Sequence, residues 1–122
     1  MSAKAFCVSL TNAHSNPDNA TVGLVVANAA IGCDKETTLF LSCDGAWLAK
    51  RGEAEKIVLG SPFVPAKELL DKFVAAGGKI LVCAPCMKKR DITEADLIEG
   101  AAPAGGATLV EILADGAACV SY

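Results

Sequence analysis

The sequence predicts an α/β fold in which helices cover both faces of a mainly parallel sheet, giving three α/β/α layers. Strand-like and helix-like segments alternate along the 122 residues, an order typical of parallel strands joined by right-handed helical crossovers. Hydrophobic residues make up 52% of the chain but aromatic residues only 5%, so the core consists mainly of Ala, Val, Leu and Ile, which suits layered packing. This length fits one domain, spanning residues 1–122.

The first part of the chain predicts two strands and one long helix. Residues 5–10 are rich in strand formers and lead into the polar loop 11–18. Residues 19–31 are rich in Ala and Val and apolar on nearly every side, which predicts a helix buried on more than one face. Residues 37–42 form the second strand, and an Asp-Gly turn follows at residues 43–45.

The middle of the chain carries one strong helical pattern between weaker ones. We expect a helical turn over residues 46–51 and a brief strand or turn at residues 57–59. Pro65 then opens an amphipathic helix that ends at Gly77 and Gly78.

The last part predicts two further strands and two helices. Residues 79–83 form an apolar strand, and Thr93 begins a capping box for a short helix through Glu99. A final helix follows Gly105-Gly106, and residues 118–121 form the last strand.

Three segments are expected to meet at one edge of the sheet. In open parallel sheets the functional crevice lies at the carboxyl ends of the strands. The loop 11–18, the turn 43–45 and residues 83–86 each follow such an end. The sequence therefore predicts that these segments share one site.

The motif Cys83-Ala84-Pro85-Cys86 is the most informative feature of that edge. A thiol where a strand meets a helix points toward unpaired backbone N–H groups, which favour the nucleophilic thiolate. Pro85 suits the first helical turn, and the second sulfur lies within reach of the first. Redox or sulfur chemistry is the favoured interpretation. The alternative is that both cysteines are buried and act as small hydrophobic residues.

Further side chains at this edge are candidates for lining the site. His14 could act as a base or hydrogen-bond partner to a thiolate, and the basic segment 88–90 could lower a thiol pKa. A zinc site built from Cys83, Cys86, Cys43 and His14 is chemically complete but lacks a second paired motif. We expect the remaining cysteines, Cys7, Cys33 and Cys119, to have packing roles. The candidate lining residues are Thr11, Asn12, His14, Cys43, Asp44 and Arg90.

Charge and hydropathy restrict the partners. The formal net charge is −3 and no basic stripe interleaved with aromatic residues occurs, so nucleic acid binding is not predicted. Residues 1–6 lack the apolar stretch of a secretory signal, and the most apolar run, residues 20–31, is too short to span a bilayer. We therefore expect a cytoplasmic protein without a membrane partner. A mean hydropathy of +0.41 is high for so small a chain and predicts association between subunits.

With these residues in view, the chain resembles the DsrE/DsrF-like family of small sulfur-handling proteins. The likeness spans nearly the whole length and rests on the order and spacing of individually loose motifs. Those motifs are Leu10-Thr11-Asn12, Asn16-Pro17-Asp18, Asp44-Gly45, Gly78-Lys79-Ile80-Leu81-Val82-Cys83, Lys89-Arg90-Asp91-Ile92 and Leu97-Ile98-Glu99-Gly100-Ala101.

The resemblance implies a five-stranded parallel sheet and assembly into trimers or hexamers. It also implies that one cysteine, which maps onto Cys83, accepts sulfane sulfur as a persulfide. The chain departs from the family pattern at two positions. Family members often have Gly after the Arg, where this chain has Asp91, and Cys86 is not a general family feature.

The leading hypothesis is a sulfur-relay protein, acting as a persulfide carrier or sulfurtransferase. Cys83 as thiolate would accept sulfane sulfur from a donor protein and pass it to an acceptor protein, with Cys86 as the resolving thiol and with no diffusible cofactor. One alternative is a thiol–disulfide oxidoreductase or peroxide-reducing protein that uses Cys83 and Cys86. The other is a metal or small-ligand binding module.

Overall fold

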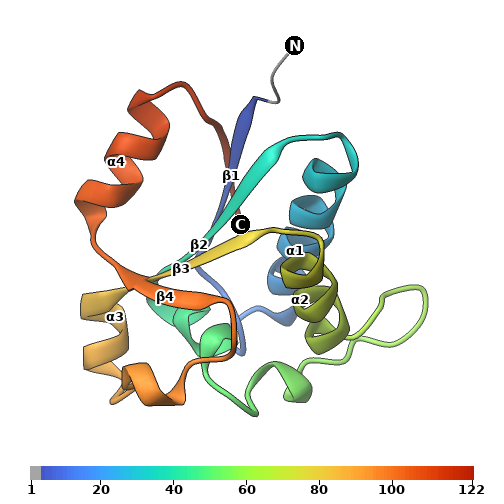
Figure 1. Ribbon diagram of the computed structural model, residues 1–122. Coiled ribbons are helices and arrows are strands. Elements are labelled where there is room, and N and C mark those ends of the chain that lie inside the picture. Colours follow the sequence, from blue (N-terminus) through green and yellow to red (C-terminus); the bar gives the residue numbers. More distant parts are fainter. Residues whose placement is uncertain (1–3) are drawn as a thin grey trace.

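A computed structural model describes residues 4–122 and contains one five-stranded sheet in the order β4-β3-β2-β1-β5, with every neighbouring pair parallel (Figure 1). This arrangement confirms the predicted fold class. Residues 1–3, part of the segment examined for a secretory signal, lie outside the described residues. The elements are β1 (Ala5–Leu10), α1 (Pro17–Gly32), β2 (Glu36–Leu41), η1 (Cys43–Ala49), η2 (Ala54–Lys56), α2 (Ala66–Ala75), β3 (Lys79–Cys83), α3 (Ala84–Lys89), η3 (Glu94–Asp96), β4 (Ala101–Ala104), α4 (Gly106–Ala114) and β5 (Ala118–Ser121), where η marks a 3-10 helix.

The edge strand β4 is the element that local sequence patterns missed. Alanine is a poor strand former, and Pro103 cannot donate a ladder hydrogen bond, so this segment has no strand signal of its own. Proline is tolerated here because β4 pairs only with β3 and leaves its other side free. The brief strand considered at residues 57–59 is absent, and the capping box at Thr93 is present but begins only a three-residue turn.

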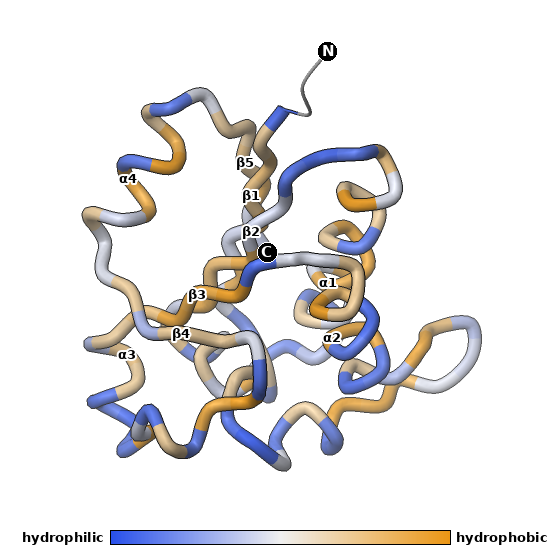
Figure 2. Tube along the Cα trace, viewed as in Figure 1, coloured by the Kyte–Doolittle hydropathy of each residue, from blue (hydrophilic) through white to orange (hydrophobic). Residues whose placement is uncertain are grey.

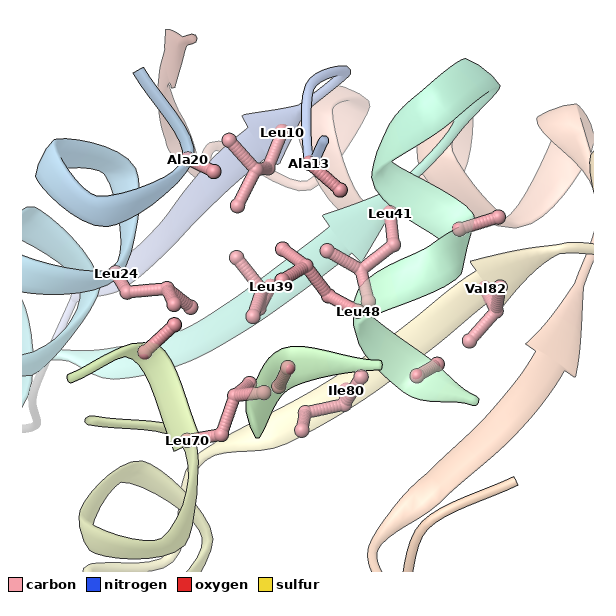
Figure 3. Close-up of a cluster of buried hydrophobic side chains, with 14 of the residues drawn as sticks. Leu10, Ala13, Ala20, Leu24, Leu39, Leu41, Leu48, Leu70, Ile80 and Val82 are labelled. Atoms are coloured by element: carbon pink, nitrogen blue, oxygen red, sulfur yellow. The ribbon is translucent and has the colours of Figure 1, made fainter. Parts of the chain in front are cut away.

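One face of the sheet carries the main core. Helices α1 and α2 lie together on this face (Figure 1), and alternate residues of the central strands point toward them. Figure 3 shows how Leu24 and Leu70 from these helices meet Leu39 and Ile80 from the sheet, and all four are fully buried. Burial of such aliphatic side chains supplies the dominant stabilisation of this half of the molecule.

Helix α1 corrects one expectation. The buried residues of α1 form a single stripe that includes Ala20, Leu24 and Ala27, whereas Val25 is 41% exposed. The prediction that residues 19–31 are buried on more than one face is therefore wrong for the single chain.

The opposite face of the sheet is only loosely covered. Helix α4 lies on this side (Figure 1), and Figure 2 shows that it carries strongly hydrophobic positions. None of its nine residues is buried, and Val110 is 65% exposed. The two faces of the sheet therefore differ sharply in packing.

Gly45 permits the close approach that shapes the carboxyl edge of the sheet. Its N–H donates to the carbonyl oxygens of Thr11 (3.1 Å) and Ser42 (2.9 Å), and a Cβ at this position would lie 2.2 Å from the carbonyl oxygen of Leu10. Only glycine fits this gap without moving the backbone. The turn after β2 is thereby held against the end of β1.

Among residues 4–122, every helix is too short or too polar to be a candidate membrane span.

Candidate functional site

The Cys83-Ala84-Pro85-Cys86 motif occupies the strand-to-helix junction that the sequence predicted. Cys83 is the last residue of β3 and the N-cap of α3, and Pro85 lies in the first turn of that helix. Both cysteines are half-buried and carry free thiols. The junction therefore keeps the two sulfur atoms near the surface of the carboxyl edge.

A third cysteine joins them from the neighbouring strand. Cys43 follows β2, and its backbone N–H donates a hydrogen bond to Sγ of Cys86 at 3.1 Å. Cys43 has a φ of 54°, the left-handed region that few residues other than glycine adopt. We call Cys43, Cys83 and Cys86 the thiol cluster.

The pKa values within the thiol cluster differ in direction. Partial burial, followed by the thiol contact with Cys86, raises the pKa of Cys83. Burial alone would also raise the pKa of Cys86, but hydrogen bonds from the Cys83 thiol and the Cys43 N–H, with the nearby Arg90 charge, lower it overall. These contacts therefore make the Cys86 thiol easier to ionise than the Cys83 thiol.

Arg90 and Asp44 hold the surroundings of the thiol cluster in place. The Arg90 guanidinium donates to the carbonyl oxygen of Cys86 at 3.1 Å, which keeps a positive charge at the end of α3. One Asp44 carboxylate oxygen accepts hydrogen bonds from the backbone N–H of Ala13 (2.7 Å) and from Ser15 N–H (3.0 Å) and Oγ (2.8 Å). Burial alone would raise the pKa of Asp44, but these hydrogen bonds lower it overall. Asp44, which directly follows Cys43, thus anchors the first loop to the turn after β2.

The other candidate residues make contacts away from the thiols. The Nε2 atom of His14 bonds Oε1 of Glu53 at 2.9 Å. The Thr11 hydroxyl and the Asn12 amide both donate to the carbonyl oxygen of Tyr122, each at 3.0 Å. His14 is therefore engaged by a carboxylate, while Thr11 and Asn12 connect the first loop to the end of β5.

One further expectation about side chains needs revision. Cys7 is fully buried, as a packing role requires, but Cys33 and Cys119 are exposed. Within the described residues 4–122, no three His, Cys, Asp or Glu side chains form a group able to hold a metal ion. Of the four zinc ligands considered from the sequence, His14 is bonded to Glu53.

Sequence reasoning missed the backbone donor that Cys43 presents to Cys86. The cysteine was a lining candidate, but its left-handed conformation and the hydrogen bond across 43 positions are tertiary features. Its position directly before Asp44-Gly45 is the one local signal, because Asp-Gly marks a tight turn whose N–H groups are free to bind. Ser15, which contacts Asp44 twice, was also not singled out.

Together these features define a small parallel α/β protein with a cluster of three thiols at the carboxyl edge of its sheet. The profile of the DsrE/DsrF-like family matches residues 4–122, and the chain belongs to this family. Membership connects the chain with sulfur relay at the level of the family.

Several relatives share part of the sequence. The uncharacterized protein MJ0760 of Methanocaldococcus jannaschii is 32% identical over 103 residues, which are 84% of this chain but only 37% of that protein's length. The uncharacterized protein MK0008 of Methanopyrus kandleri is 31% identical over a region that covers 76% of this chain and 73% of that protein's length. A second M. jannaschii protein, MJ0989, is 33% identical over 79% of this chain and 80% of its own.

Two solved structures share the fold at low sequence identity. The YchN protein of E. coli superposes with a TM-score of 0.75 at 16% identity, covering 98% of this chain and 99% of that one. MTH1491 of Methanobacterium thermoautotrophicum, a protein of unknown function, gives a TM-score of 0.73 at 14% identity with the same coverage. These similarities support the architecture alone.

Proposed function

We propose that this protein relays sulfane sulfur through its thiol cluster, with Cys86 as the attacking thiolate instead of Cys83. The observation that carries the proposal is the 3.1 Å hydrogen bond from the Cys43 N–H to Sγ of Cys86. A backbone donor and the Arg90 charge both favour a negative sulfur at this position. The half-buried setting leaves this sulfur within reach of a donor.

The loading step needs no cofactor or external oxidant. The Cys86 thiolate attacks the terminal sulfur of a donor persulfide, R–S–SH. A bond forms between Cys86 and that sulfur, the donor's S–S bond breaks, and R–S⁻ leaves with the electron pair. Cys86 then carries the sulfane sulfur as Cys86–S–SH. The same N–H that supports the thiolate can donate to the loaded side chain.

Cys83 has a distinct role in this scheme. Its thiol donates to the Cys86 thiolate, so it supplies the proton that keeps the pair singly ionised. A deprotonated Cys83 could later attack the inner sulfur of the loaded Cys86, forming an 83–86 disulfide and expelling HS⁻. A dithiol reductant would then be required to restore both thiols.

The interaction between the Cys83 and Cys86 thiols also favours a second candidate, a thiol–disulfide oxidoreductase. That function would cycle the same pair between dithiol and disulfide without carrying additional sulfur. The alternatives therefore differ in whether a loaded sulfur atom is ever found on Cys86.

Persulfide loading tests the proposal. The reduced protein is treated without oxygen with inorganic polysulfide, alkylated, digested and mapped by mass spectrometry. We expect added sulfur on Cys86, retention of that label in Cys83→Ser, and its loss in Cys86→Ser. Rapid formation of an 83–86 disulfide with no added sulfur would support the oxidoreductase instead, and sulfur confined to Cys83 would return the attacking role to that residue.

We further propose that a small persulfide donor and an acceptor protein meet this chain as a homo-oligomer, a trimer or a hexamer, in the cytoplasm. The support is helix α4, whose residues are all at least partly exposed although Leu109, Val110, Ile112 and Leu113 are apolar. Light scattering on the purified protein should give a multiple of the chain mass of 12.4 kDa, and Val110→Asp should lower it. A monomer at micromolar concentration would contradict this assembly.

A further inference from the structure

The position of Cys43 suggests more than a backbone donor. Besides its N–H bond to Cys86, its own side chain interacts with the Cys86 sulfur. Cys86 therefore has a neighbouring thiol on each of two sides: Cys83 from the end of β3 and Cys43 from the turn after β2. Cys43 is exposed, whereas Cys83 and Cys86 are half-buried.

The conformation of Cys43 is unusual enough to require a reason. A φ of 54° is unfavourable for a residue with a Cβ, and glycine or asparagine normally occupies such positions. Its N–H points at the Cys86 sulfur, 3.1 Å away. The surrounding turn is held by Gly45 against β1 and by Asp44 against the first loop, so this conformation is well supported.

We infer that Cys43 is the exit thiol of a three-cysteine relay: it takes the sulfane sulfur from Cys86 and presents it to the acceptor protein. The inference rests on the proposed function, since it begins with loaded Cys86. It assigns hand-off to the exposed member of the thiol cluster and loading to the half-buried one.

The transfer step balances within the cluster. The Cys43 sulfur, as thiolate, attacks the terminal sulfur of Cys86–S–SH. A Cys43–S bond forms, the Cys86 S–S bond breaks, and Cys86 leaves as the thiolate that the Cys43 N–H and Arg90 already favour. The products are Cys43–S–SH and the starting form of Cys86, so no oxidant or reductant is consumed. The acceptor thiolate repeats the same displacement on Cys43 and carries the sulfur away.

Accessibility explains why two carriers are useful. A half-buried sulfur between two other thiols is reached easily by a small persulfide but poorly by a thiol attached to a folded protein. An exposed sulfur can be reached by both, but the backbone donor and the Arg90 charge that favour an attacking thiolate lie at Cys86, so loading begins there. Passing the sulfur across one contact within the cluster replaces a hindered encounter with an intramolecular step, which proximity favours strongly.

A timed loading experiment tests the order of events. Reduced protein receives one equivalent of glutathione persulfide without oxygen, samples are alkylated at intervals, and each cysteine is mapped. We expect label on Cys86 first and on Cys43 later, and loss of both labels in Cys86→Ser. Equal labelling of Cys43 in Cys86→Ser would overturn the relay, because Cys43 would then load independently.

A second measurement compares transfer of the sulfur to a small acceptor with transfer to a bulky one. Loaded protein is mixed either with free cysteine or with thiol-bearing agarose beads. In Cys43→Ser we expect transfer to the beads to fall by roughly tenfold or more, while transfer to free cysteine changes far less. The serine variant keeps the backbone N–H, so loading of Cys86 should persist. Unchanged transfer to the beads would overturn the inference.

The matched control is Cys33→Ser, which removes an exposed thiol at the end of α1 and should change neither measurement. Loading of Cys86 without any label on Cys43 would refute the exit role and leave the proposed function standing. Absence of sulfur on every cysteine would refute both.

Discussion

Two pairs of neighbouring cysteines in this chain have opposite chemical environments. Cys83 and Cys86 lie at the carboxyl end of β3, where the Cys86 pKa is lowered. Cys7 and Cys119 lie directly opposite each other in the middle of β1 and β5, where burial and then the proximity of Cys119 raise the pKa of Cys7 to about 12. Adjacent thiols alone therefore do not make a reactive site.

The difference follows from where backbone N–H groups are available. Within β1, which is paired on both sides, the backbone N–H groups are used in ladder hydrogen bonds and are not available to the Cys7 sulfur. Beyond the end of β2 the ladder stops, so the Cys43 N–H is free to reach the Cys86 sulfur. The edge of the sheet thus supplies a free backbone N–H to a thiol, whereas the centre of the sheet does not.

Alkylation should show the largest contrast between the two pairs. Because only thiolates react and the pKa values lie on opposite sides of the ordinary value, Cys86 should react with iodoacetamide at pH 7 more than about a thousandfold faster than Cys7. Residue-specific mass spectrometry of the native protein measures both rates. Similar rates in the folded state would break the comparison, and labelling in denaturant provides the control.

Gly45→Ala should strongly disturb the turn that carries the backbone donor. The new Cβ would meet the Leu10 carbonyl oxygen at 2.2 Å, so the backbone must shift, at a cost of about 3 kcal/mol in the free energy of unfolding. Denaturant titration measures the loss. Gly32→Ala is the matched control, because its Cβ meets nothing within 4 Å, and it should change stability by less than about 1 kcal/mol. Equal stability of the two variants would contradict the role given to Gly45.

Arg90→Gln should modestly reduce the difference in alkylation rate between Cys86 and Cys7. Removing the cation destabilises the Cys86 thiolate, so its pKa should rise, the midpoint of its alkylation rate should move to higher pH, and its rate at pH 7 should fall severalfold. The pH profile of alkylation provides the measurement. Lys88→Gln removes an exposed charge from the same helix and serves as the control. A midpoint that moves equally in both variants would show that general charge, not Arg90, matters.

His14→Gln should have the smallest effect on the thiols. The imidazole is bonded to Glu53 at 2.9 Å, so its loss should change persulfide loading of Cys86 by less than about twofold. Loading rates of the variant and the parent protein test this. A large loss of loading would restore His14 as a base for the site.

Much of the fold was predictable from local patterns. The alternation of apolar strands with helical segments predicted the parallel sheet, and Pro85 predicted a helix beginning directly after β3. The same reasoning predicted that the segments after β1, β2 and β3 meet, and Asp44 and Cys43 do connect them. The strand β4 escaped detection because Ala and Pro carry no strand signal, and its pairing with β3 is a tertiary property.

The sequence by itself determined which chemistry is available: two thiols three residues apart, where a strand ends and a proline favours a helix. Only the tertiary structure decided which of the two thiols ionises more readily. That choice depends on a backbone N–H supplied from 43 positions away and on a φ of 54° at Cys43. Local spacing predicts where a side chain lies along its own element, but ionisation responds to every donor and charge within a few ångströms, whichever part of the chain supplies it.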